Sequence, residues 1–324
     1  MSYNKQNAAK ILSDYAQRPQ KALAAAAEKK QKIYLAIPEI KALDEKISLI
    51  GFKYFAQAQL GPEGLEERLE KLKEENLALR KIRGELLKAN GYPEDYTNVK
   101  FSCNKCNDTG YCGMDMCQCL REELVKAGYE SSGLKNLVRT QSFESFSLDN
   151  YSKTRDPKTG YSDYQIMKGI SDRCRLYAKE FSLQSDSLLF VGATGLGKTH
   201  LSSAIAKEVI AKGYDVVYET APNILSTFEK ERFTSAQEVS TDKFFQCDLL
   251  IVDDLGAEYQ GKNSVSIIYN LINTRLVSQK PMIISTNLGY KALENQYDQR
   301  IISRLFGEFC VMLFEGTDLR RKNI

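Results

Sequence analysis

The sequence predicts an α/β protein in which a parallel sheet is flanked by helices, with a helical region and a small cysteine-rich segment ahead of it. Two observations favour this fold class. Short apolar runs rich in β-branched residues alternate with segments of helical spacing, the pattern of a parallel sheet covered by helices. Five of the eight cysteines are clustered in residues 103–119, well ahead of these runs. The runs are SLLFVG (187–192), VVYE (216–219), LLIVDD (249–254) and PMIIST (281–286).

The composition is that of an ordinary cytosolic chain. Its 324 residues suffice for one large domain and a smaller one. The formal net charge is only +3, so no global basic field calls for nucleic acid, although a local basic patch remains compatible with it. Eight cysteines without a signal peptide indicate the reducing cytosol, where clustered cysteines bind metal more often than they form disulfides. The apolar runs are too short to cross a bilayer, so we expect a cytoplasmic protein without a membrane role.

Four parts follow one another along the chain. Residues 1–97 are predicted to be helical, residues 98–122 hold the cysteine cluster, residues 123–163 form a linker, and residues 164–324 form the α/β domain. In the helical part, apolar residues recur in alternating steps of three and four, which places them on one stripe of each helix. The first stripe is Ile40, Leu43, Ile47, Ile50 and Tyr54, and the second is Leu65, Leu69, Leu72, Leu79 and Leu86.

The second stripe contains a heptad seam that Asn76 and Arg83 interrupt, which weakens the seam and fixes its register. Two interpretations are open. The favoured one is two or three amphipathic helices packed on one another. The other is a seam that docks on a partner protein.

The segment GATGLGKT, from Gly192 to Thr199, matches a phosphate-binding loop between a strand and a helix. Its glycines let backbone N–H groups turn inward around phosphate oxygens, and the helix N-terminus adds positive potential. The lysine is placed to reach the β- and γ-phosphates, and the threonine hydroxyl to ligate Mg²⁺. A glycine-rich turn without ligand is the alternative. The candidate nucleotide-binding residues are Gly192, Thr194, Gly195, Gly197, Lys198 and Thr199.

Polar side chains follow the third and fourth apolar runs. Asp253 ends the third run, where a carboxylate can hold Mg²⁺ directly or through water. Asp254 is the candidate to polarise an attacking water, and Asn287, just past the fourth run, is placed to orient that water. A helix cap or salt bridge for the carboxylates, and a simple turn for the asparagine, are the alternatives.

Arg300 and Arg304 lie four residues apart in RIISRLFG, on one face of a predicted helix. An arginine offered across a subunit boundary neutralises transition-state charge and is worth about 10³- to 10⁵-fold in rate. The alternative is an exposed or helix-capping arginine.

The cysteine segment contains two ligand pairs, Cys103-x₂-Cys106 and Cys117-x-Cys119. Four thiolates from two turns suit a closed tetrahedral Zn²⁺ site, which is structural rather than catalytic. Cys112 is a fifth candidate that could replace Cys117 or Cys119. Bound zinc is worth about 10–16 kcal/mol in finger peptides and would supply the folding energy of so small a segment. Redox chemistry or free thiols are the alternative.

The order of these motifs resembles the AAA+ ATPases and, within them, the bacterial replicative helicase loaders of the DnaC/DnaI type. The resemblance rests on GATGLGKTHL, CDLLIVDDLG, IISTN, QRIISRLFG and FEGTDLRRK, together with CNKCNDTGY and CQCL, and covers roughly residues 100–324. It implies that Asn287 is the sensor 1 residue, Arg304 the arginine finger and Arg320 the sensor 2 arginine. Asp254 departs from the Glu of most AAA+ proteins, which suggests slow turnover. Only twenty residues follow Arg304, so we expect no helical lid.

The resemblance implies an ATP-dependent loader whose helical region grips a hexameric replicative helicase. Its ATPase domain would bind ATP and Mg²⁺, self-associate and engage single-stranded DNA. Lys230, Arg232 and Lys243 are candidate DNA contacts or simply a solvated face. One alternative is a transposition helper of the IS21 type, which would bind duplex DNA and a transposase. Another is a nucleotide-dependent scaffold that barely hydrolyses ATP.

Overall fold

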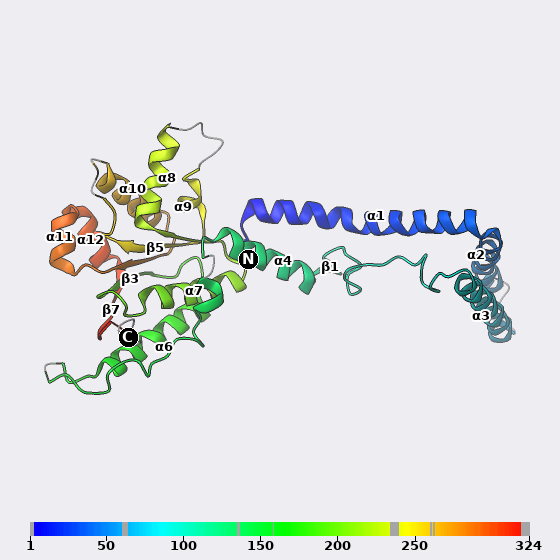
Figure 1. The fold of residues 1–324 in the computed structure, drawn as a ribbon, viewed down its shortest axis with the longest axis horizontal. Coiled ribbons are helices and arrows are strands. Elements are labelled where there is room, and N and C mark those ends of the chain that lie inside the picture. The colour runs from blue at the N-terminus through cyan, green and yellow to red at the C-terminus, as the bar shows by residue number, and fades with distance from the viewer. Residues whose placement is uncertain are drawn as a thin grey trace. The chain divides into compact units, whose positions relative to one another are not determined.

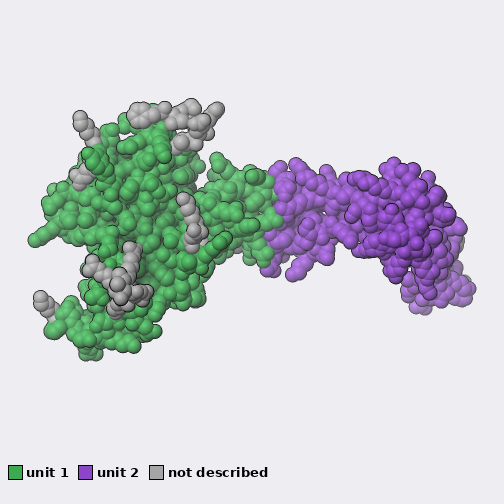
Figure 2. All heavy atoms as spheres, viewed as in Figure 1, with its two compact units in different colours: residues 1–11, 121–324 green, residues 12–120 purple. Residues whose placement is uncertain are grey.

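The chain divides into two compact units, residues 1–11 with 121–324, and residues 12–120 (Figure 2). Among the described residues, no helix combines the length and apolar character that a membrane crossing requires. The computed structural model describes most of the chain, namely residues 3–59, 64–134, 137–157, 159–233, 240–259, 261 and 263–318.

Helices dominate the unit of residues 12–120. They are α1 (Lys5–Ala36), which begins in the other unit, α2 (Pro38–Gln59) and α3 (Leu65–Ala89). The helix α1 ends where it does because a residue before proline is disfavoured in helical conformation, and Pro38 suits the first turn of α2, where no N–H is needed.

The predicted stripes of α2 and α3 pack on each other. Ile40 and Ile50 are fully buried, and the Tyr54 hydroxyl donates to the Leu69 carbonyl over 3.3 Å. Off the stripe, Leu49 and Phe52 are 58% and 73% exposed. The helices α2 and α3 therefore pack on each other, as in the favoured interpretation. The leucines of the heptad seam are only half-buried, whereas Leu87, outside the predicted stripe, is fully buried.

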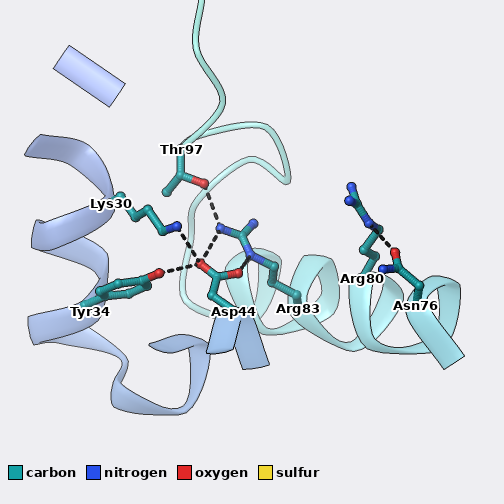
Figure 3. A network of polar contacts seen from close by, with 7 residues as sticks. All are labelled: Lys30, Tyr34, Asp44, Asn76, Arg80, Arg83 and Thr97. Carbon is teal, nitrogen blue, oxygen red and sulfur yellow. Dashed lines mark hydrogen bonds and ion pairs between the residues drawn. The ribbon is translucent and has the colours of Figure 1, made fainter. Parts of the chain in front are cut away.

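A polar network ties the ends of these helices together (Figure 3). The Asp44 carboxylate accepts from Arg83 Nε at 2.6 Å and from the Tyr34 hydroxyl at 2.8 Å, with Lys30 Nζ at 3.7 Å. The Arg83 guanidinium also donates to Thr97 Oγ1 at 2.8 Å. The arginine that interrupts the seam in sequence thus pairs with a carboxylate on the neighbouring helix and fixes how the two helices meet.

The cysteine segment follows α3 and leads into α4 (Gln118–Ser131). It contains a two-stranded antiparallel sheet of β1 (Tyr111–Cys112) and β2 (Asp115–Met116). This small hairpin turns the chain back so that the two cysteine pairs meet.

The unit of residues 1–11 and 121–324 is built on a five-stranded parallel sheet with the order β4-β5-β6-β3-β7. The four predicted strands are confirmed. A fifth strand, β7, was not predicted, because it follows a helix almost directly and contains one β-branched residue, Val311. The strands are β3 (Ser187–Val191), β4 (Val216–Thr220), β5 (Leu249–Leu255), β6 (Met282–Thr286) and β7 (Phe309–Leu313).

Helices cover both faces of this sheet, as Figure 1 shows for α6 and α7 against α8 and α10. Alternate residues of β3 explain the two layers. Leu188 and Phe190 belong to the core under α6 and α7, while Leu189 and Val191 belong to the core under α8 to α12. The helices are α5 (Leu137–Thr140), α6 (Asp163–Glu180), α7 (Lys198–Ala211), α8 (Ala221–Phe233), α9 (Asp242–Gln246), α10 (Ser264–Val277), α11 (Tyr290–Gln296) and α12 (Gln299–Gly307).

The strand β4 lies at one end of the sheet, and a short segment covers part of its outer edge. The backbone N–H of Tyr218 donates to the Ser132 carbonyl over 2.6 Å. A side chain at Gly133, which has φ +86°, would bring a Cβ within 2.3 Å of the Tyr218 carbonyl oxygen. Glycine is therefore needed for this segment to approach the strand so closely.

Candidate functional site

The predicted phosphate loop connects β3 to α7 at the carboxyl edge of the sheet. Gly197 caps the helix with φ +84°, and a Cβ there would lie 2.8 Å from the Phe146 ring. A larger residue would be strained and would clash, so glycine is required. Because β3, β5 and β6 are neighbours, their carboxyl ends bring the loop and the polar residues of the other two strands to one place.

Lys198 is buried and held by oxygen acceptors. Its Nζ donates to the Gly192 carbonyl at 2.5 Å, the Ala193 carbonyl at 2.7 Å and Asn287 Oδ1 at 2.6 Å. The ammonium thus lies folded against its own loop and against the end of β6. Phosphate oxygens are stronger acceptors than carbonyls and would compete for these N–H groups.

Asp253 ends the buried part of β5 beside the loop. Its carboxylate accepts from Thr199 Oγ1 at 3.1 Å, from the Tyr218 hydroxyl at 2.6 Å and from the Ser285 hydroxyl. Burial, with Asp253 adding to it, raises the pKa of Tyr218, which keeps that hydroxyl a donor. The Thr199 and Asp253 oxygens lie together, as two protein ligands of Mg²⁺ must. Tyr218 and Ser285, which hold this carboxylate, were missed by sequence reasoning.

Asp254 lies in a bulge where the register between β5 and β6 shifts, with φ +56°. Aspartate tolerates this left-handed conformation better than most residues, and bulges of this kind redirect side chains near functional sites. The Asp254 backbone N–H donates to Ser285 Oγ at 3.0 Å, and Asn287 Nδ2 donates to Asp254 Oδ1 at 2.9 Å. The structure therefore brings together Lys198, Asp254 and Asn287.

A pocket lies over this cluster. One of its walls is formed by residues 141–150, a segment outside the predicted motifs. Phe146 of that segment packs edge-on against His200, with ring centroids 5.3 Å apart, and the Tyr151 hydroxyl donates to the Leu196 carbonyl at 3.1 Å. Sequence reasoning assigned no site residue here, because the segment carries no recognisable motif. The lining residues are Gln141, Ser145, Phe146, Ser147, Asn150, Thr194, Gly195, Leu196, Gly197, Lys198, Thr199, His200, Asp254 and Asn287.

The predicted arginines lie elsewhere. Arg300 and Arg304 are on α12, and among the described residues neither lines this pocket. Arg320 lies outside the described residues.

Residues 156–310, which hold the loop and the residues at the ends of β5 and β6, match the sequence profile of a family described as "IstB-like ATP binding protein". This part of the chain is an ATP-binding domain of the IstB/DnaC family.

Relatives of this IstB/DnaC-family domain include proteins named replicative helicase loader DnaC. That of Escherichia coli (strain K12) is 26% identical over 199 residues, which are 60% of this chain and 75% of the relative. That of Buchnera aphidicola subsp. Schizaphis graminum is 24% identical over 195 residues, 59% of this chain and 73% of the relative. A crystal structure of the DnaC helicase loader aligns with a TM-score of 0.44 at 19% identity, covering 56% of this chain and 99% of the other.

Ahead of the IstB/DnaC-family domain, four predicted cysteines converge. The sulfur atoms of Cys103, Cys106, Cys117 and Cys119 lie within 4.8 Å of one another, with Cys103–Cys117 at 3.9 Å and Cys106–Cys119 at 3.6 Å. A tetrahedron of Zn–S bonds of about 2.3 Å has sulfur–sulfur edges of about 3.8 Å, so the cluster fits zinc. Cys112 is exposed and lies outside this group.

Backbone amides of the cysteine segment lower the pKa of two of its thiols. The Cys119 N–H lowers the pKa of Cys117 to about 7, and the amides of Cys106 and Lys105 lower the pKa of Cys103. Thiolates, the form that binds metal, are favoured at these two positions, whereas burial raises the pKa of Cys119 to about 12. Sequence reasoning missed Asp108, a buried carboxylate that accepts from the Cys103 amide at 2.7 Å and holds the loop of the first pair.

Proposed function

We propose that this protein binds and hydrolyses ATP with Mg²⁺. The observation that carries the proposal is the convergence of Lys198, Asp254 and Asn287 beside the Thr199–Asp253 pair. In this arrangement the loop amides and Lys198 bind phosphate oxygens, and Thr199 and Asp253 hold the metal ion, which neutralises charge on the phosphates. Asp254 polarises the attacking water, and Asn287 orients it.

Turnover measurements test the ATPase proposal directly. An Asp254→Asn variant should bind ATP·Mg²⁺ but turn it over at least about tenfold more slowly, because it loses the charged acceptor. Lys198→Ala should lose nucleotide affinity and serves as the blank. Wild-type turnover no higher than that of Lys198→Ala would contradict hydrolysis and leave the scaffold alternative.

We further propose a loader role, in which the protein delivers a hexameric replicative helicase to single-stranded DNA. The support is the similarity to proteins named replicative helicase loader DnaC, together with the nucleotide site. A loading assay tests it with the full chain, the helicase of the same organism, and a circular single strand carrying an annealed oligonucleotide. Displacement of the oligonucleotide should require both this protein and ATP. A helicase that is neither captured nor stimulated would overturn the loader role.

Residues 1–97 are proposed to grip the helicase. On α2 and α3, Leu49, Phe52 and Leu77 are 58%, 73% and 59% exposed. Exposed large apolar side chains of this kind are typical anchors in protein interfaces. A Phe52→Ser variant of the full chain should lose helicase capture and keep its ATP affinity. Leu183→Ser, at a residue 47% exposed in the other unit, is the matched control.

A transposition helper of the IS21 type is the second candidate function, and the name of the matching family favours it. Such a protein would bind duplex DNA and a transposase. Lys230, Arg232 and Lys243 are exposed and serve as candidate phosphate contacts in either case. Binding to a single strand and to the duplex of the same sequence distinguishes the two functions. A preference for the single strand supports the loader, and a preference for the duplex supports the helper.

The four clustered cysteines are proposed to hold one structural Zn²⁺. Four thiolates close the coordination shell, so the ion would brace the fold of residues 98–122 without taking part in catalysis. This segment has little core of its own, and metal binding would contribute much of its folding free energy.

A further inference from the structure

The side-chain oxygen of Gln141 is a buried hydrogen-bond acceptor that has no donor among the described residues. Gln141 lines the pocket beside the phosphate loop, and its backbone N–H donates to the Leu137 carbonyl at 2.8 Å. Most buried polar groups of native proteins are paired, because an unpaired one lowers the stability of the fold. The place of this oxygen in the pocket wall indicates that a bound molecule supplies the missing donor.

The backbone around Gln141 is held in place by its neighbours. The Ser142 carbonyl accepts from His200 Nε2 at 2.8 Å, so this ring nitrogen carries a proton, and the Ser142 N–H donates to Ser145 Oγ at 2.9 Å. These bonds fix the chain just after Gln141, and the bond to Leu137 fixes it at Gln141 itself. A side chain presented from a fixed backbone loses less entropy when it binds a ligand.

Two kinds of residue line the pocket, and they assign the wall of residues 141–150 to the base of a nucleotide. Lys198 and Thr199 supply the polar groups that suit phosphates and Mg²⁺. Phe146 and His200, with ring centroids 5.3 Å apart, supply aromatic surface on the side of the pocket that holds Gln141. A base has apolar faces that stack on aromatic rings and an edge of hydrogen-bonding groups. This wall offers a partner for each.

The amide of a glutamine side chain matches the edge of adenine. The exocyclic amino group of adenine donates, and the ring nitrogen beside it accepts, so one amide satisfies both. Guanine carries an oxygen in place of that amino group, which would face the buried oxygen of Gln141. Turning the amide over would bury two N–H groups in place of one oxygen, and the guanine oxygen would satisfy only one of them.

We propose that Gln141 is a specificity-determining residue whose side-chain oxygen accepts a hydrogen bond from the exocyclic amino group of adenine. This inference rests on the proposed ATPase function and adds the choice of base to it. The amino group is the donor that distinguishes adenine from guanine, and binding it would pair the one buried acceptor that Gln141 brings to the pocket wall.

Equilibrium binding of ATP analogues to the full chain, with Mg²⁺ present, tests the inference without a measurement of turnover. Purine riboside triphosphate differs from ATP only in lacking the amino group. The wild type should bind it about 5- to 100-fold more weakly than ATP, because the buried acceptor then stays unpaired. GTP should bind at least as weakly. In Gln141→Leu, which has no acceptor, the affinities for ATP and for purine riboside triphosphate should become equal.

Three controls separate base recognition from folding. Gln141→Glu keeps an acceptor oxygen and should keep the preference for ATP over purine riboside triphosphate, although its charge weakens the binding of both. Gln184→Leu, the same substitution at an exposed glutamine outside the pocket lining, should leave both affinities unchanged. Gln141→Leu should unfold at a temperature no lower than the wild type, because it removes an unpaired buried acceptor.

The outcomes are distinguishable. A wild type that binds ATP and purine riboside triphosphate equally overturns the inference and leaves the proposed function intact. A preference for ATP that persists in Gln141→Leu assigns the amino group to another residue and also overturns it. Weaker binding of 2′-deoxy-ATP that disappears in Gln141→Leu would place the amide at the ribose instead, with the same result. A wild type that binds neither ATP nor its analogues contradicts the proposed function, and the inference falls with it.

Discussion

The ammonium nitrogen of Lys198 lies 2.6 Å from the side-chain oxygen of Asn287, and the amide nitrogen of the same asparagine donates to Asp254 at 2.9 Å. One side chain therefore bridges the phosphate loop and the residue proposed to polarise water. The amide oxygen of Asn287 accepts from the Lys198 cation, and the amide nitrogen donates to the Asp254 carboxylate. Only this orientation of the amide suits both partners. The loop end of β3 and the bulge of β5 are thus coupled through the end of β6.

Replacing Asn287 should separate ATP binding from hydrolysis. In Asn287→Ala the loop amides and Lys198 remain, so we expect the dissociation constant for ATP·Mg²⁺ to change less than about fivefold. Turnover should fall roughly 10²- to 10³-fold, the usual cost of one prearranged polar contact in a reaction centre. Equilibrium titration and steady-state turnover measure the two effects. Asn270→Ala is the control, and a parallel loss of affinity and turnover would argue against an orienting role.

The cysteine cluster should contain one zinc ion per chain. Cys106→Ser removes a buried ligand and should abolish the stoichiometric metal found by elemental analysis of the purified protein. It should also lower the protection of residues 98–122 against amide exchange, because the metal contributes folding free energy there.

Cys112→Ser is the matched control for that experiment, since this exposed thiol lies outside the cluster and should leave the metal content unchanged. Equal zinc loss in both variants, or wild-type protein free of zinc after purification without chelators, would contradict the assignment.

Phe146 should contribute to recognition of the nucleotide base. Its ring forms a wall of the pocket beside the phosphate loop, and aromatic–base stacking is worth about 1–3 kcal/mol per base. Phe146→Ala should therefore weaken ATP binding about 5- to 100-fold and leave the affinity for inorganic tripolyphosphate unchanged. Calorimetry with both ligands measures this difference. Tyr161→Ala, at a residue that is 61% exposed and is not among those lining the pocket, is the control. Equal weakening toward both ligands would place the Phe146 ring near the phosphates instead.

The Asp44 carboxylate should make the helical unit sensitive to acid. Burial raises its pKa, but the hydrogen bonds from Arg83 and Tyr34 outweigh burial, so the pKa lies below the ordinary value of 3.8. As the pH falls, the Asp44 carboxylate is therefore protonated in the unfolded chain before it is protonated in the folded one. The stabilisation is present above pH 3.8 and is lost as the pH falls through the folded-state pKa.

Asp44→Asn should remove about 1–2 kcal/mol of stability from α2 and α3 at pH 7 and flatten the loss of stability between about pH 5 and 3. Amide exchange of these helices against pH measures both effects. Asp95→Asn, which removes an exposed ion pair with Lys100, should have little effect. A wild-type profile as flat as that of Asp44→Asn would show that the network is not what stabilises the unit.

Motifs and periodicity predicted the sheet, the loop and the paired cysteines, because each depends on local spacing. The positions of Asp253 and Asp254 relative to each other could not be predicted, since a bulge redirects the second one. Tyr218 and Phe146 were missed for a related reason. Their roles arise from tertiary contacts between distant segments, and no local pattern marks them. The fifth strand was missed because its five residues follow α12 almost directly and include one β-branched residue, Val311.

The contact between Ser132 and Tyr218 has a consequence for how the protein behaves at high concentration. An uncovered outer strand offers unpaired backbone groups to any extended chain, and native proteins commonly block such edges to avoid aggregation. Here the block depends on a glycine lying against the strand, in a segment that takes no part in the proposed chemistry. Replacing Gly133 would be expected to lower the yield of monodisperse protein before it affected any enzymatic measurement.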